Sequence, residues 1–387
     1  MRIKIVGSGH ISATNPEEGQ PDWVAYQAGK TSVRFDPALE MMAASLPVWK
    51  VSEMQDFLLD YGRFDHHDYS CRMAIYAAKQ AVIQANWRQA NFDIICGCSR
   101  GPTELWERYF TTFYEQDSLR PKTSPLTTLG SIGFALADFF GQTGLNTGQS
   151  VTCSSGLHAM VHAVALLRAG MSERVLVGGT EAPLTRFTAS QMKAMRVVAT
   201  SSKATTYPCQ PLGPTPTGMV VGEGAALFCL SSEQGVDSDI ELVGIGYAQE
   251  VHPSLSGISR RGEAIRTAMQ MAIEAAGGRP DLIIPHAPGT KAGDRAEIAA
   301  LQDVFGPGSI PPIYSGKWAT GHTFGASGPL ALSLALDILQ RGQVPTLPYE
   351  LSPEVRKWTE NDALKTVMVN ATGFGGNAVS VMVRLAR

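Results

Sequence analysis

A cysteine at position 153 and two histidines at positions 286 and 322 are the residues of this chain best suited to covalent chemistry. Cys153 stands in VTCSSG, just before a run that begins a helix, where unpaired N–H groups and the helix dipole stabilise an anion. A thiol placed there is expected to be a better nucleophile, and the small residues at 154–156 let a substrate approach closely. A lone cysteine is more often an inert buried thiol. The interpretation therefore depends on residues elsewhere.

Those residues come from the second half of the chain. PHAPGTKAGDRAE places His286 at the end of an apolar strand, and SGKWATGHTFGASG places Lys317 and His322 just ahead of an apolar helix. NATGFGGNA adds a glycine-rich hairpin tip around Phe374, which lacks the following helix of a dinucleotide fingerprint. Either histidine alone would more often be a core residue. The combination of a thiol, two imidazoles and a lysine is what indicates a functional site.

The elements that must position these residues repeat along the chain. Residues 92–101 read as an apolar strand, residues 154–170 as a helix that is apolar nearly all round, and residues 175–177 as a buried strand. After about residue 235 the same order of strands and an apolar helix returns, ending in a hairpin over 366–386. The pattern predicts an α/β protein of two similar halves, 1–235 and 236–387, each with a buried central helix.

Composition narrows the function classes. The chain has 387 residues, of which 44% are hydrophobic and 17% charged, so it can bury a large core. The net charge of −3 argues against nucleic acid or an anionic membrane as partner, and no apolar run approaches the ~18 residues that span a bilayer. Residues 1–12 read as a strand and turn rather than a signal peptide. The six cysteines form no CxxC pairs, which favours free thiols and a cytoplasmic protein.

With these residues in view, the sequence resembles the β-ketoacyl-acyl carrier protein synthases of the thiolase superfamily, specifically the elongating type. The resemblance covers almost the whole chain, and the candidate residues fall in the family's order and at about its spacing. It implies the thiolase fold, in which two duplicated halves form a five-layer αβαβα sandwich. The segments that carry it are RMAIYAAKQAV, VTCSSG, VLVGGTEAPLT, GMVVGEGAALFCL, HAPGTKAGDRAE, GKWATGHTFGASG and GFGG.

The resemblance also implies a role for each residue. Cys153 would carry an acyl chain as a thioester, while His286 and His322 would flank the carbonyl of a malonyl thioester and stabilise the enolate left by decarboxylation. The backbone N–H groups of Cys153 and Phe374 would hold the tetrahedral oxyanion, and Phe374 would gate the two half-reactions. Lys317 would organise His322 and the local electrostatics. No cofactor and no metal are expected, because the substrates arrive on the phosphopantetheine arm of an acyl carrier protein.

Two partners are expected from the same resemblance. The first is a homologous subunit, in a homodimer or in a heterodimer with a chain-length factor. The second is the acidic carrier protein, for which Arg63, Arg72 and Lys203 fall where the family's docking residues lie, although such clusters are often only solvated surface. Metal binding by His66, His67 and Cys71 is disfavoured because no second ligand cluster matches it.

The sequence also departs from the family's usual residues at several positions. Pro288 stands where Thr is common, Ala331 where a carboxylate usually pairs near the lysine, and Gln210 and Pro211 where Phe-Asp is usual. They favour a specialised pathway, such as a polyene-like polyketide, and require another partner for Lys317, because an isolated buried charge is costly.

Three rival functions remain open to different degrees. The main alternative is a non-catalytic chain-length-factor-like partner that has kept its cysteine. A thiolase is disfavoured because NATGFGGNA contains no second cysteine. A cysteine hydrolase is disfavoured because it has no use for two histidines around an enolate or for the duplication.

Overall fold

The structure is a computed structural model that describes residues 2–62, 64, 66–199, 206–236, 238–251 and 257–386. Two of the three predicted docking residues, Arg63 and Lys203, lie outside the described residues. The candidate residues Cys153, His286 and His322 are all within them.

A long mixed sheet runs through the molecule. Within the described ranges, nine strands follow one another in the order β10-β11-β12-β9-β1-β8-β6-β4-β5. The two halves of the chain join where β9 pairs with the start of β1, through Ile3 with Leu242 and Lys4 with Glu241. The strands are β1 (Ile3–Ser12), β4 (Asp93–Gly97), β5 (Asn146–Gln149), β6 (Arg174–Glu181), β8 (Gly224–Ser231), β9 (Ile240–Gln249), β10 (Leu282–Ile284), β11 (Thr366–Gly373) and β12 (Asn377–Leu385).

The two halves of this sheet repeat the same pairing. In the N-terminal half β1 and β6 are antiparallel to β8, and β4 is parallel to β6. In the C-terminal half β9 and β11 are antiparallel to β12, and β10 is parallel to β11. Beyond β4 lies the parallel strand β5, and beyond β10 a single parallel bridge joins Ile283 to Ile313. The expected duplication is therefore present in the strand topology.

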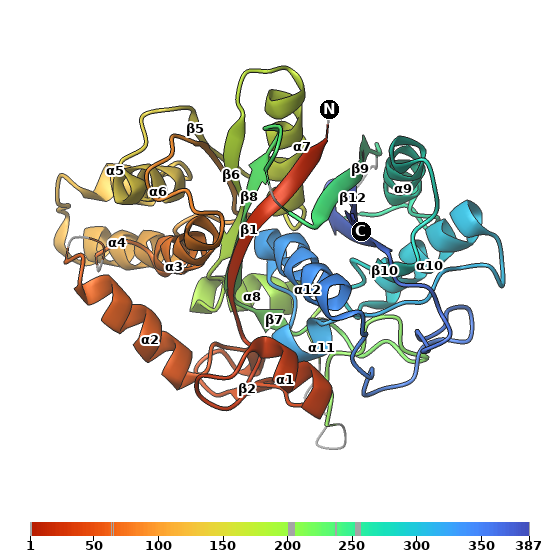
Figure 1. The fold of residues 1–387 in the computed structure, drawn as a ribbon. Helices are drawn as coiled ribbons and strands as arrows, with labels where there is room; N and C mark the ends of the chain where they lie inside the picture. Colours follow the sequence, from red (N-terminus) through yellow and green to blue (C-terminus); the bar gives the residue numbers. More distant parts are fainter. Residues whose placement is uncertain are drawn as a thin grey trace.

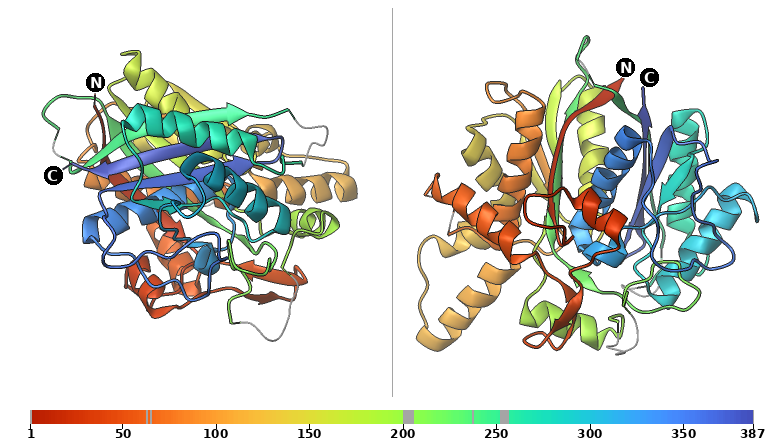
Figure 2. Two further views of the ribbon diagram at one scale, coloured as in Figure 1. Left: turned by 90° about the vertical axis from the view of Figure 1, so that its right-hand side faces the viewer. Right: turned by 60° about the horizontal axis from the view of Figure 1, so that its bottom comes forward.

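Helices form three layers around the two halves of the sheet, as Figure 1 and the right-hand view of Figure 2 show. α7 (Ser155–Arg168) and α12 (Ser327–Arg341) lie in the middle, between the N-terminal and the C-terminal strands. α3 (Tyr69–Gln84) and α6 (Ser131–Phe140) cover the outer face of the N-terminal strands. α9 (Glu263–Ala276) and α10 (Lys291–Phe305) cover the outer face of the C-terminal strands. This confirms the expected five-layer αβαβα arrangement.

The remaining elements lie around this sandwich (Figure 1). A small sheet has the order β2-β3-β7 among the described residues. Its strands are β2 (Arg34–Asp36), β3 (Met41–Ala44) and β7 (Val221–Gly222). The other helices are α1 (Asp22–Ala28), α2 (Val48–Leu59), α4 (Thr103–Gln116), α5 (Thr123–Thr127), α8 (Arg186–Ala194), α11 (Lys317–Thr320) and the 3-10 helix η1 (Phe324–Ala326).

The apolar sequences of the two central helices explain their position. α12 contains SGPLALSLAL, which leaves no broad polar face, so the helix must be covered on most sides. Its Leu332, Ala335 and Ile338 are fully buried, and they share one core cluster with Leu157 and Ala163 of α7. The prediction of buried central helices is confirmed, and the N-terminal ends of both helices lie at the site described below.

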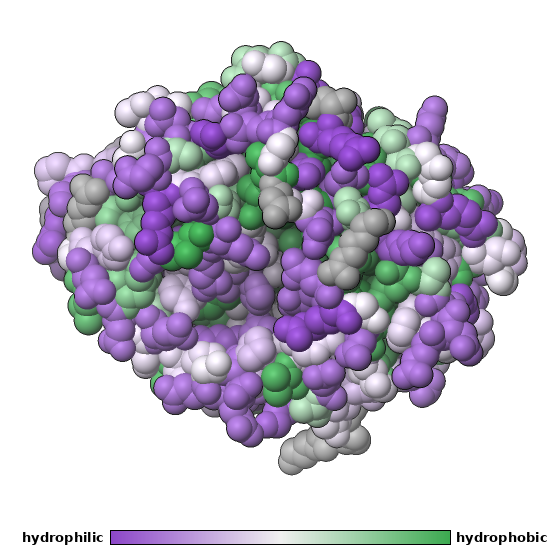
Figure 3. Space-filling view, viewed as in Figure 1, coloured by the Kyte–Doolittle hydropathy of each residue, from purple (hydrophilic) through white to green (hydrophobic). Residues whose placement is uncertain are grey.

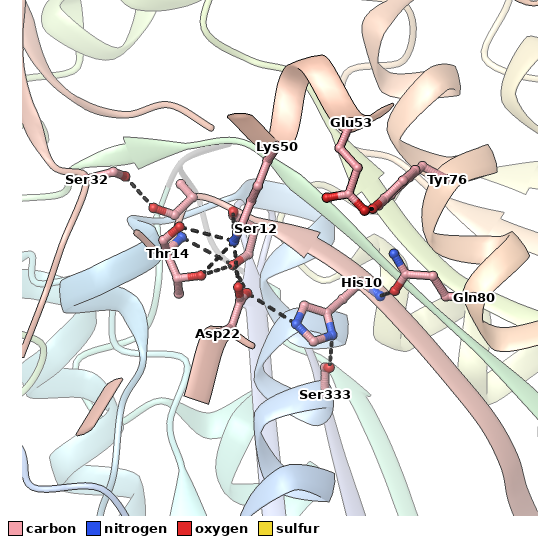
Figure 4. A network of polar contacts seen from close by, with 11 residues as sticks. His10, Ser12, Thr14, Asp22, Ser32, Lys50, Glu53, Tyr76, Gln80 and Ser333 are labelled. Carbon is pink, nitrogen blue, oxygen red and sulfur yellow. Dashed lines mark hydrogen bonds and ion pairs between the residues drawn. The ribbon is translucent and has the colours of Figure 1, made fainter. Parts of the chain in front are cut away.

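A buried polar network anchors the N-terminal segment to this core (Figure 4). The Asp22 carboxylate pairs with Lys50 Nζ at 2.5 Å and lies 3.2 Å from His10 Nε2. Lys50 also donates to the carbonyl oxygens of Ser12 and Thr14. The network thus ties β1, α1 and α2 together, and the partners offset the cost of burying these charges.

The face seen in Figure 3 is mostly hydrophilic, with small separate hydrophobic areas. Among the helices in the described part of the chain, none combines the length and the apolarity needed to cross a bilayer.

Candidate active site

Cys153, the candidate nucleophile, lies on a tight turn between β5 and α7. The residue before it, Thr152, has a left-handed backbone with φ of 49°. The Ser155 hydroxyl closes the turn, because its oxygen accepts the Val151 N–H at 2.9 Å and its proton is donated to the Thr152 carbonyl at 2.6 Å. The serines that follow Cys153 therefore shape the turn that presents the thiol, which is 7% exposed.

The two central helices meet closely beside this turn. A Cβ on Gly156 would overlap the Pro329 ring of α12 and lie 2.7 Å from the Gly325 carbonyl oxygen. Only glycine fits this contact. Gly156 thus lets the first turn of α7 approach the segment that carries His322.

His286 directly follows the short strand β10 and Pro285. The Glu297 carboxylate of α10 accepts the backbone N–H groups of His286 at 3.0 Å and Ala287 at 2.6 Å. This carboxylate fixes the chain where the strand ends and so sets the position of the imidazole.

His322 is held like a strand residue against the N-terminal half. It forms an isolated parallel bridge with Val221 of β7, with its N–H donated to the Val220 carbonyl at 2.7 Å and its carbonyl accepting the Gly222 N–H at 3.0 Å. Its side-chain Nδ1 lies 2.7 Å from Ser327 Oγ. Backbone and ring are therefore both fixed.

The two imidazoles lie side by side. Their centroids are 5.0 Å apart and their planes are inclined by 87°. Burial lowers the pKa of His322 to about 3, helped by the charge of Lys317. Burial, followed by His322 and Lys317, holds the pKa of His286 well below its usual value. Both rings are therefore neutral at pH 7, and each carries a single N–H donor.

Lys317 is buried next to the histidines, 5% exposed. Its ammonium donates to the Pro285 carbonyl at 3.2 Å, which is the partner that the absence of a carboxylate at Ala331 requires. This bond reaches the residue before His286 rather than His322, and the charge of Lys317 lowers the pKa of both imidazoles. Burial lowers the pKa of Lys317, and the carboxylate of Glu297 opposes this.

The thiol and the two rings border one cavity of about 580 Å³. Met195, Val197, Val198 and Met219 give it apolar walls, and Pro288 and Thr290 lie on the side of α10. A cavity of this size with a few convergent polar groups is typical of a small-molecule site. The structure thus brings Cys153, His286, His322 and Phe374 together around a common space, with Lys317 behind it.

Phe374 lies at the tip of the β11–β12 hairpin, where its side chain is half-buried and lines the cavity. Its carbonyl oxygen accepts hydrogen bonds from Thr152 Oγ1 at 3.1 Å and Asn377 Nδ2 at 3.0 Å. Because Thr152 is also the residue before Cys153, the hairpin tip and the turn that carries Cys153 are directly linked. Gly375 and Gly376, with φ of 88° and 79°, complete the tip.

The electrostatics of the thiol correct one expectation. Burial raises the pKa of Cys153 to about 12, and nearby Glu181 adds to the increase, while Lys317 and Arg100 oppose it. The helix terminus therefore does not make Cys153 a thiolate at neutral pH, because loss of hydration is the larger effect. Glu181 is itself buried, accepts the N–H groups of Ser99 and Gly325, and has its pKa raised by burial to about 7.

Arg196 and Lys291 also line this cavity, and both are exposed to solvent. In the described part of the chain neither side chain has a hydrogen bond or an ion pair. The sequence analysis missed them, because neither stands in a charge cluster. Arg72, the described member of the predicted docking set, instead lies over the Tyr69 ring at 5.1 Å and 4.0 Å from Glu104, away from the cavity lining.

The last candidate group is the one that the sequence analysis considered for metal binding. Over the residues that the structure describes, no three His, Cys, Asp or Glu side chains form a metal-ligand group. Cys71, considered with His66 and His67 in the sequence analysis, is buried with its Sγ 3.9 Å from Ser131 Oγ.

Comparisons with known proteins identify the family of this chain. Residues 50–235 match the N-terminal domain of the β-ketoacyl synthase family, and residues 240–349 match its C-terminal domain. A relative from Staphylococcus aureus (strain MRSA252), 3-oxoacyl-[acyl-carrier-protein] synthase 2, is 29% identical with 98% of each chain covered.

Two solved structures share the fold at lower identity. The ishigamide ketosynthase/chain length factor has a TM-score of 0.83 at 21% identity, covering 99% of this chain and 98% of that one. A type II PKS acyl-carrier protein in complex with its ketosynthase gives 0.85 at 20%, covering 99% of each chain. The fold is therefore the thiolase fold of the ketosynthases, and from the two matched domains this chain belongs to the β-ketoacyl synthase family.

Proposed function

We propose that this protein is a β-ketoacyl-acyl carrier protein synthase that condenses malonyl-carrier protein with an acyl group held on Cys153. The observation that supports this most directly is the convergence of the Cys153 thiol and two neutral imidazoles on one cavity. No resident cofactor is needed, because the phosphopantetheine arm of the carrier protein delivers both substrates.

In the first half-reaction Cys153 takes the acyl chain. Its sulfur attacks the thioester carbonyl of the acyl carrier, a new C–S bond forms, and the C–S bond to the carrier breaks. The proton of the Cys153 thiol ends on the departing carrier sulfur. The backbone N–H groups of Cys153 and Phe374 are the proposed donors to the tetrahedral oxyanion.

In the second half-reaction the histidines act on malonyl-carrier protein. The bond to the carboxylate breaks, carbon dioxide leaves, and the electron pair forms an enolate whose oxygen accepts one N–H from His286 and one from His322. Neutral donors that strengthen as charge develops stabilise the transition state more than the ground state. The enolate carbon then attacks the acyl thioester, and the Cys153 sulfur leaves as a thiolate and is protonated by water.

Arg196 and Lys291 support delivery by a carrier protein. These two exposed cations beside the cavity have no side-chain partner among the described residues, and they suit the phosphate of a phosphopantetheine arm and the acidic surface of its carrier. Arg196→Glu and Lys291→Glu are expected to raise the KM for acyl-carrier protein, with little effect on acyl transfer from a free pantetheine thioester. Arg168→Glu, at the far end of α7, is the matched control.

The decisive experiment is intact-mass measurement after mixing the protein with a panel of acyl-carrier thioesters. The wild type should gain the mass of one acyl group, Cys153→Ala should not, and adding malonyl-carrier protein to the acylated enzyme should give β-ketoacyl-carrier protein. A folded wild type that binds the carrier but is never acylated would contradict the proposal. That result would favour the alternative, a chain-length-factor-like subunit without catalysis of its own.

Pairing with a homologous subunit belongs to the same proposal. Among the described strands β5 ends the long sheet, and α4 exposes an aromatic face. A ketosynthase/chain length factor pair is known for a protein of this fold. The exposed aromatic residues of α4 are Trp106, Phe110, Phe113 and Tyr114, each at least 46% exposed.

The departures at Pro288, Ala331 and Gln210 support a specialised fatty-acid or polyene-like polyketide pathway.

A further inference from the structure

The tautomer of His322 decides whether this ring can act as proposed. A neutral imidazole has one nitrogen that donates and one that accepts. The Nδ1 edge of His322 faces Ser327, while the ring itself borders the cavity, so a donor to a bound substrate must be Nε2. A proton on Nδ1 instead would present a lone pair to the enolate oxygen and oppose its formation.

Ser327 is placed to decide between the two tautomers. Its oxygen accepts the Thr323 backbone N–H at 2.9 Å, which leaves one hydroxyl proton to donate. The candidate acceptors are His322 Nδ1 at 2.7 Å and Thr323 Oγ1 at 3.2 Å. The first distance is ideal for a hydroxyl donor and the second is long. Thr323 Oγ1 also has a proton of its own that it can donate to Ser327.

We propose that Ser327 is a positioning residue that donates its hydroxyl proton to Nδ1 of His322 and so keeps the reactive proton on Nε2. The inference rests on the proposed function, because it assigns His322 the role of enolate donor. Ser327 reaches the ring because it is the first residue of α12, one turn after the histidine, and it is 5% exposed. A buried hydroxyl with three polar neighbours has little freedom to rotate.

The surroundings of Ser327 strengthen the argument. Lys317, Thr320, Thr323 and Ala331 line with it a small cavity of about 20 Å³. The charge of Lys317 helps to keep the His322 ring neutral, and only the neutral ring has a nitrogen that can accept the Ser327 proton.

The direct test is nitrogen NMR of the full-length protein with ¹⁵N-labelled histidine, with His322 assigned by comparison with His322→Gln. Two-bond proton–nitrogen correlations distinguish the two neutral tautomers. We expect the wild type to show a protonated Nε2 and an accepting Nδ1 between pH 6 and 8. In Ser327→Ala the His322 signals should move toward the other tautomer. A protonated Nδ1 in the wild type would overturn the inference.

Kinetics provide a second readout. Ser327→Ala should lower kcat for malonyl-carrier decarboxylation about tenfold or more and leave KM within about twofold, as expected for a group felt mainly in the transition state. Ser327→Thr should restore most of the rate, because it keeps the hydroxyl and the adjacent cavity can take a methyl group. An unchanged kcat in Ser327→Ala would also overturn the inference.

Ser333→Ala is the matched control. Ser333 lies on the same helix, and its hydroxyl contacts Nδ1 of another histidine, His10, at 2.8 Å (Figure 4), but it does not line the cavity that holds Cys153. It should lose similar stability and keep its decarboxylation rate. If the wild type shows the Nε2–H tautomer yet neither decarboxylates nor condenses, the proposed function fails while the assignment to Ser327 stands.

Discussion

The imidazole of His286 meets that of His322 edge to face, with centroids 5.0 Å apart. One ring follows β10 in the C-terminal half, and the other is bridged to Val221 of β7. The pair is therefore fixed by contacts from both halves of the chain. Its burial removes the pH sensitivity that histidines usually show near neutrality.

The first prediction concerns this pH sensitivity. His322 has its pKa lowered to about 3, so the ring stays neutral as the pH falls through 6.5. The kcat for malonyl decarboxylation should therefore show no loss attributable to histidine protonation between pH 8 and 5. Stability should behave differently, because an unfolded histidine gains a proton below about 6.5 and stability is lost as the pH falls toward 3. A rate that drops tenfold per pH unit below 6.5 would contradict the buried neutral pair.

The second prediction concerns the cysteines. Cys153 alone among the described cysteines lines the cavity, so iodoacetamide should label it before Cys71, Cys96, Cys98, Cys209 or Cys229. With a pKa raised to about 12, the thiolate fraction is small at pH 7, and the labelling rate should rise about tenfold per pH unit up to pH 10. Peptide mapping after timed labelling measures both. A rate that levels off near pH 7 would show that the helix terminus outweighs burial.

The third prediction separates the half-reactions. Cys153→Ala should abolish acyl transfer but retain measurable malonyl decarboxylation, because the two imidazole donors do not depend on the thiol. Carbon dioxide release from malonyl-carrier protein is the measurement, and Cys153→Ala/His322→Ala is the control that should lose it. A folded Cys153→Ala protein that binds malonyl-carrier protein without decarboxylating it would exclude the two-site mechanism.

The fourth prediction compares two buried lysines. Lys317→Met should slow decarboxylation while changing the thermal midpoint little, because the lost bond to the Pro285 carbonyl is offset by removal of a buried charge. Lys50→Met should lower the thermal midpoint and change the decarboxylation rate little. It leaves Asp22 without its cation and costs about 3–5 kcal/mol of unfolding free energy.

Calorimetry and the decarboxylation assay on both variants give the comparison. Because burial lowers the pKa of Lys317 below its ordinary 10.5, the wild type gains stability as the pH rises toward that value, and any advantage of Lys317→Met should shrink accordingly. If Lys317→Met were as unstable as Lys50→Met with an unaltered rate, Lys317 would be structural.

Some predictions from the sequence stay predictions. The boundary between residues 235 and 236 is one, since the strands of the two halves join in a continuous order. The docking roles of Arg63 and Lys203 are others, because both residues lie outside the described ranges. Arg72 is described, but its contacts with Tyr69 and Glu104 give no direct support for docking.

The sequence by itself determined the layered α/β fold, the duplication and the order of Cys153, His286, Lys317, His322 and Phe374. These follow from local information: apolar runs that make a helix or strand bury itself, and short motifs that form their own turns. Only the tertiary structure decided that Lys317 reaches the Pro285 carbonyl, that burial raises the pKa of the thiol, and which cations and which hydroxyl adjoin the site. Hydration, charge and hydrogen bonding depend on atoms brought together from distant segments, and spacing along the chain does not specify those distances.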